Sequence, residues 1–147
     1  MFKHILVPTD GSPLSQSAVA RAVAFAKEAG ARITLFYAEP DAPAAYAGMG
    51  ALSSAHLTQE VHARLDGAAR DILAAAEQVA RDAGVACDCL ALVGNQPYAL
   101  IIQAAESRGC DLIFMASHGR RGLSALLLGS ETQKVLTHST IPVLVYR

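Results

Sequence analysis

Short apolar runs alternate along the chain with segments whose apolar residues recur at helical spacing. Such runs are typical of strands that are buried on both faces of a parallel sheet. The alternation predicts parallel β-α-β units and therefore an α/β fold. The runs predict five strands, at residues 3–8, 32–38, 86–93, 111–116 and 141–146.

Four helices are predicted between these strands, at residues 12–30, 61–84, 95–109 and 130–138. Ser12 and Pro13 form an N-cap and first-turn pair at the start of the first helix. Ser130, followed three residues later by Gln133, predicts a capping box at the start of the last. Residues 39–55 are rich in Ala, Pro and Gly and show no clear period, which predicts a flexible loop that is either a functional flap or a disordered insertion.

The hydrophobic content, the first residues and the net charge indicate the number of domains, the location and the partners to expect. The 147 residues are 52% hydrophobic, and no stretch of about 20 consecutive apolar residues occurs, so we expect one domain over residues 1–147 and no membrane association. The first residues lack the apolar region of a signal peptide, which makes a cytoplasmic location the expectation. A formal net charge of −1 offers no general field that would attract nucleic acid.

The three cysteines, Cys87, Cys89 and Cys110, include no C-x-x-C pair. They indicate neither a disulfide framework nor a zinc site, and we interpret them as small buried hydrophobes. His56 and His62 lie six residues apart, which does not place them on one helical face. We therefore expect no metal held by the protein alone.

Two polar loops follow the first and the fourth predicted strands. They read "PTDGS", residues 8–12, and "ASHGRRGLSALLLGS", residues 116–130. In doubly wound parallel sheets, ligands bind outside the carboxyl ends of the strands, where the strand order reverses. If the first and fourth strands are neighbours, these two loops frame one crevice.

The second loop has the properties of a phosphate site. A glycine-bearing loop that ends at a helix N-terminus offers backbone N–H groups and the positive end of the helix dipole. Gly129 would let a phosphate approach the backbone closely. The alternative is that Ser130 only caps the helix, while Gly119 and Gly122 only turn the chain.

Individual polar residues in the two loops have similar alternatives. Asp10 can accept hydrogen bonds from a ribose or help to hold a metal bound to phosphate, or it can form an Asx turn or a helix cap. His118 can contact a phosphate or act as an acid or base, but no catalytic partner lies near it in sequence, which favours a lining role. Arg120 and Arg121 either reach a triphosphate or are solvated.

The segments "KHILVPTDGS" and "CDLIFMASHGRRGLSALLLGSETQKVLTHSTIPVLVYR", with the order of elements between them, resemble the universal stress protein family along essentially the whole chain. The nucleotide signature of that family is Gly, two residues, Gly, nine residues, Gly, then Ser or Thr. Here Gly119, Gly129 and Ser130 keep the spacing, and Ala116 stands at the first position. The family has one branch that carries the signature and binds ATP and another that lacks it and holds no nucleotide.

The resemblance implies a Rossmann-like five-stranded parallel sheet of order 3-2-1-4-5, which makes strands one and four neighbours. It also implies a homodimer formed through the last strand, Val143 to Val145. Asp10 would contact the ribose or adenine side, with any Mg²⁺ of the nucleotide near it, and the backbone of Ala38 would meet the adenine. Carried over position by position, the residues that would surround ATP are Pro8, Thr9, Asp10, Ala38, Met115, Ala116, His118, Gly119, Gly129, Ser130 and Thr132.

The leading functional hypothesis is an ATP-binding stress-response or signalling protein that turns over ATP slowly or not at all. The alternative is a nucleotide-free dimeric interaction module of the same family, in which the glycine loop is only structural. A related pyrophosphatase or nucleotidyl transferase would need Ser-Gly-Gly or His-x-Gly-His near the first strand, and "PTDGS" offers neither motif.

Overall fold

Five parallel strands form one sheet in the order β3-β2-β1-β4-β5, the order that the family resemblance implied. The computed structural model describes residues 1–41, 55–120 and 127–147. Within them Ile5, on a central strand, lies opposite Ile33 on one side and Leu112 on the other. The strands are β1 (His4–Pro8), β2 (Arg32–Glu39), β3 (Cys87–Val93), β4 (Leu112–Ala116) and β5 (Val143–Tyr146).

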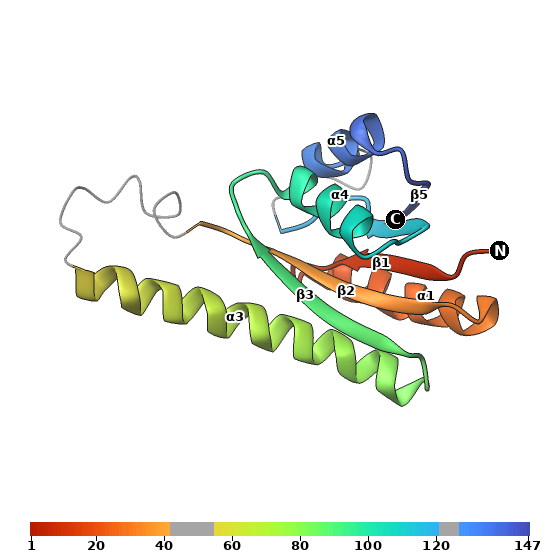
Figure 1. Ribbon diagram of the computed structural model, residues 1–147, viewed down its shortest axis with the longest axis horizontal. Helices are drawn as coiled ribbons and strands as arrows, with labels where there is room; N and C mark the ends of the chain where they lie inside the picture. The colour runs from red at the N-terminus through yellow and green to blue at the C-terminus, as the bar shows by residue number, and fades with distance from the viewer. Residues whose placement is uncertain (42–54, 121–126) are drawn as a thin grey trace.

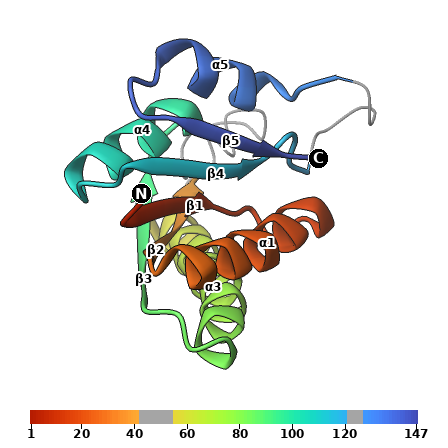
Figure 2. The same ribbon diagram turned by 90° about the vertical axis from the view of Figure 1, so that its right-hand side faces the viewer.

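Helices cover both faces of the sheet (Figure 1). Figure 2 shows α1 and α3 on one face and α4 and α5 on the other. No helix in the described ranges is both long enough and apolar enough to span a membrane. The helices are α1 (Pro13–Ala29), α3 (Ala55–Asp82), α4 (Pro97–Ser107) and α5 (Ser130–His138).

Successive residues of each strand point to opposite faces of the sheet, so the core has two halves. Ile5 and Val7 pack toward α1 and α3, whereas Leu6 and Phe36 pack toward α4 and α5. All four are fully buried. A sheet covered on both faces explains why the central strands read as continuous apolar runs.

The predicted loop over residues 39–55 is shorter than expected at both ends. Glu39 still belongs to β2, because it pairs with Val93 and its carbonyl accepts a hydrogen bond from Gly94 N at 2.9 Å. Helix α3 begins at Ala55, before the apolar face that predicted it. The rest of the predicted loop, residues 42–54, lies outside the described residues.

The starts of α1 and α5 differ in their capping. Ser12 caps α1 as predicted, and its hydroxyl accepts a hydrogen bond from Ser15 N at 3.3 Å. The predicted capping box of α5 is wrong, because the N-cap is Gly129 and the Gln133 side chain donates to the Leu128 carbonyl instead. The helix itself covers Ser130–His138 as predicted, and Gly129 N, just before it, donates to the Ser117 carbonyl at 2.7 Å.

Candidate functional site

The loops after β1 and β4 lie side by side at the carboxyl edge of the sheet, as the family resemblance implied, because β1 and β4 are paired. Asp10 connects the two loops. Its Oδ1 accepts a hydrogen bond from Ser12 N at 2.9 Å, and its Oδ2 accepts one from Arg120 N at 2.9 Å. The first bond is the Asx turn given as the alternative interpretation of Asp10. The second reaches across 110 residues of sequence, and no local pattern indicated it.

The environment of Asp10 favours its charged form. Burial by itself would raise the pKa of this carboxyl group. Hydrogen bonds from the side chain and backbone of Ser12 and from the backbone of Arg120 outweigh burial and hold the pKa below its ordinary value. The linked loops therefore carry a carboxylate at neutral pH.

Both glycines of the retained signature are in close contact with other parts of the protein. A Cβ atom at Gly119 would collide with Oδ2 of Asp10. A Cβ atom at Gly129 would lie 3.1 Å from His118 Cα and 3.2 Å from the Ser117 carbonyl oxygen, closer than ordinary packing allows. The protein's own packing thus favours glycine at both positions, whether or not a phosphate approaches them.

Two other predicted site residues are buried where β4 ends. Thr132 is 3% exposed, and its hydroxyl donates to the Ala116 carbonyl at 3.1 Å, which ties α5 to the end of the strand. Ala116 is 8% exposed. Strand alternation puts its methyl group on the same face as Phe114, toward α1, and opposite to Met115. Ser130, the first residue of α5, is exposed.

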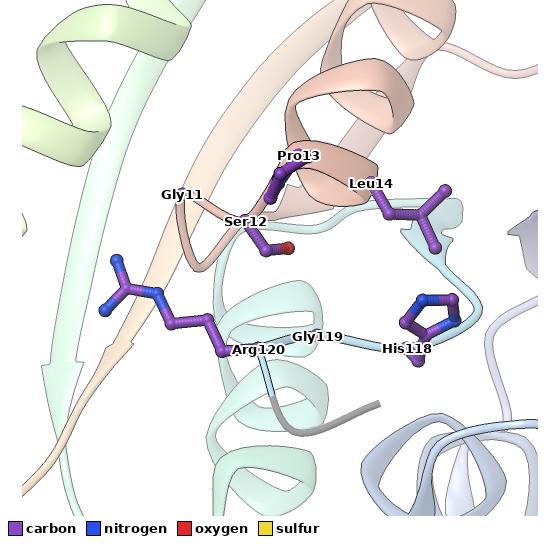
Figure 3. Close-up of a pocket in the computed structure, with 7 residues that line it drawn as sticks. All are labelled: Gly11, Ser12, Pro13, Leu14, His118, Gly119 and Arg120. Atoms are coloured by element: carbon purple, nitrogen blue, oxygen red, sulfur yellow. The ribbon is translucent and has the colours of Figure 1, made fainter. Parts of the chain in front are cut away.

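An open cavity of about 470 Å³ lies where the two loops meet the N-terminus of α1 (Figure 3). Of the predicted site residues, His118 and Gly119 line it. Figure 3 shows the Arg120 side chain pointing away from His118. Arg120 also lines a second cavity, of about 340 Å³, between α1 and α3, to which the buried Thr9 contributes.

Three predicted adenine or ribose contacts lie on the other face of the sheet, toward α4 and α5. Met115 is buried there, and Ala38 is partly buried against the same core. Pro8 is half-buried, and it lies on the same face as Leu6 because residues two apart on a strand share a face. In the described part of the chain, the structure thus brings the two loops together but divides the predicted residues between the two faces.

The sequence analysis missed Glu39, a buried carboxyl group at the end of β2 beside Ala38. It is 5% exposed. Burial raises its pKa, the neighbouring Asp66 carboxyl of α3 raises it further, and His62 partly opposes both. A charged residue that directly follows the apolar run of a strand was the signal that could have identified it.

The family model described as the Universal stress protein family matches residues 1–147. The chain belongs to the universal stress protein family. Among its relatives, universal stress protein MJ0531 of Methanocaldococcus jannaschii is 33% identical over 147 residues, which are all of this chain and 83% of that protein.

Solved structures of family members share the fold. The structure of hypothetical protein MJ0577, also from Methanocaldococcus jannaschii, matches with a TM-score of 0.82 and 29% identity, over 99% of this chain and 95% of that one. A universal stress protein solved in complex with cAMP matches with a TM-score of 0.68 and 26% identity, over 99% of this chain and 97% of that one.

Proposed function

We propose that this universal stress protein binds ATP at the carboxyl edge of the sheet, between the loops after β1 and β4. It acts as a stress-response or signalling protein whose bound nucleotide alters its shape or its partners, with little or no turnover. The cAMP complex of a family member supports an adenine nucleotide as the ligand class.

The observation that carries the proposal is the start of α5. The glycine loop leads into a helix whose N-cap, Gly129, provides no side-chain hydrogen bond, and the hydroxyl of the next residue, Ser130, is exposed. The first N–H groups of a helix have no partner within the helix, and the helix dipole is positive at this end. A phosphate group supplies the acceptors that such N–H groups lack.

The remaining contacts follow from the same arrangement. Each carboxylate oxygen can accept more than one hydrogen bond, so Asp10 can hold both loop amides and still accept a ribose hydroxyl. Its charge also suits a Mg²⁺ ion that arrives with the nucleotide. Backbone groups near Ala38 would recognise the adenine.

Calorimetric titration with ATP and magnesium tests the proposal. We expect micromolar or tighter binding, which corresponds to about 8 kcal/mol or more, and weaker binding of GTP. Mass spectrometry of the small molecules released when the purified protein is denatured should detect an adenine nucleotide. Absence of both binding heat and a thermal shift at millimolar ATP would contradict the proposal.

One observation favours the alternative, a nucleotide-free dimeric interaction module. Gly119 and Gly129 are both explained by contacts within the protein, so their retained spacing does not by itself require a ligand. In this alternative the loop only positions α5, and the function lies in pairing of the edge strand β5 with a second copy. The same titration separates the two candidates.

A further inference from the structure

We propose that Asp10 is a positioning residue that clasps the loop after β4 onto the start of α1, and so presets the amide groups of that loop before any ligand arrives. The clasp consists of the Asp10 carboxylate, the N–H groups of Ser12 and Arg120, and the Cα of Gly119. This inference rests on the proposed nucleotide site and assigns Asp10 a positioning role in addition to the ligand contact proposed above.

The loop is fixed on two sides. On the α5 side, Gly129 N donates to the Ser117 carbonyl at 2.7 Å, and Thr132 Oγ1 donates to the Ala116 carbonyl at 3.1 Å. On the α1 side, the described contact that reaches from the β1 loop to the backbone of the β4 loop is the bond from Arg120 N to Asp10. Without it, residues 118–120 would be anchored at one side only.

Gly119 is part of the clasp because of its size. A Cβ atom at this position would collide with Oδ2 of Asp10, so a side chain would displace the carboxylate. The glycine and the aspartate therefore act as one unit, since removal of either opens the same contact. Residues that act as a unit give effects that do not add in a double-mutant cycle.

The chain contains a matched control at the opposite edge of the sheet. Asp111, which directly precedes β4, also accepts two backbone N–H groups, from Lys3 at 2.8 Å and from His4 at 3.0 Å. Its carboxylate links the segments that begin β1 and β4, as Asp10 links the loops that follow them. Asp111→Ala therefore removes the same kind of bond without touching the proposed site.

The first experiment measures amide hydrogen exchange by NMR in the nucleotide-free protein. We expect Asp10→Ala to speed exchange of the Arg120 amide at least tenfold, because alanine removes the oxygen that accepts from this amide. Gly119→Ala should have the same effect, and Asp111→Ala, which removes the corresponding bonds at the opposite edge, should leave the Arg120 amide unchanged. Unchanged exchange of the Arg120 amide in Asp10→Ala would overturn the clasp. An equal change in Asp111→Ala would also overturn it, because it would show a general loss of stability.

The second experiment measures ATP affinity by calorimetry for Asp10→Ala, Gly119→Ala and the double variant. Each single variant should bind at least tenfold more weakly, and the double variant should bind no more weakly than the weaker single one. Fully additive losses would show that Asp10 acts as an independent ligand contact and would overturn the positioning role. If wild-type protein binds no ATP while the exchange results hold, the proposed function fails and the clasp stands.

Discussion

Ala116 shows at the scale of one residue how the fold decides the meaning of a sequence departure. It stands where the family signature has glycine, and its methyl group is buried on the α1 face of β4. Helix α5, with Gly129 and Ser130 at its start, packs on the opposite face. The added methyl group therefore lies on the face of the sheet opposite to the start of α5.

We accordingly expect Ala116→Gly to change ATP affinity less than tenfold, or about 1.4 kcal/mol, in calorimetric titrations. A glycine within a strand costs roughly 0.5–1 kcal/mol of stability, so Ala91→Gly on the exposed part of β3 serves as the control for that backbone effect. A much larger gain in affinity would identify Ala116 as a steric gate and place the natural chain in the nucleotide-free branch.

At the scale of an element, β5 is the part of the sheet best suited to a second copy. It pairs with β4 on one side, from Val143 opposite Ile113 to Tyr146 opposite Ala116, and it ends the sheet on the other side. All four of its residues are half-buried. An apolar edge strand presents N–H and C=O groups that a two-fold axis can pair symmetrically.

We predict a homodimer formed by antiparallel pairing of Val143, Leu144 and Val145 with the same strand of a partner. Proline substituted at each position in turn should make at least one variant monomeric, because proline removes whichever N–H faces the partner. Light scattering at tens of micromolar protein reports the mass, and circular dichroism checks that each variant stays folded. A monomer mass for the unmodified protein would contradict the prediction.

At the scale of the whole molecule, a chain of polar groups crosses the sheet near its amino edge. His4 Nε2 lies 2.7 Å from Thr34 Oγ1, which donates to Asp88 Oδ1 at 2.6 Å, and Arg108 pairs with the other oxygen of Asp88 at 2.8 Å. Because the threonine proton goes to Asp88, His4 Nε2 is the donor to Thr34. His4 is 5% exposed, and within the described ranges its Nδ1 has no hydrogen-bond partner.

Burial of His4, with a smaller contribution from Arg32, lowers its pKa below the ordinary value of 6.5. As pH falls below 6.5, the unfolded chain takes up a proton that the folded protein does not. We therefore expect the free energy of unfolding to decrease from pH 7 toward pH 5, by at most about 1.4 kcal/mol per pH unit for one proton.

Urea unfolding of His4→Gln across this pH range tests the assignment. The variant should be less stable than the wild type, but its free energy of unfolding should depend less on pH. Subtracting the variant's stability curve from that of the wild type cancels the contributions of other groups such as Glu39. If the free energy of unfolding of His4→Gln changed with pH as steeply as that of the wild type, a group other than His4 would cause the pH dependence.

The fold was largely predictable because its signals are local. The apolar runs marked all five strands, and Ser12 and Gly30 marked the ends of α1. The capping of α5 was not predictable in the same way. Ser130 and Gln133 fit a local capping-box pattern, but the N-cap is Gly129, whose N–H donates to Ser117, and the Gln133 side chain donates to the Leu128 carbonyl. These contacts take the place of the predicted capping box.

The α/β class, the positions of the two polar loops and the retained glycine spacing follow from local sequence, because periodicity and turn residues act over a few neighbouring positions. The family resemblance added the strand order that makes those loops neighbours. Three-dimensional packing was needed to show that Asp10 holds the Arg120 amide, that Gly119 fits against that carboxylate, and that the Ala116 methyl group is on the α1 face. These contacts join residues that are remote in sequence or depend on the face of the sheet, and local spacing contains no information about either.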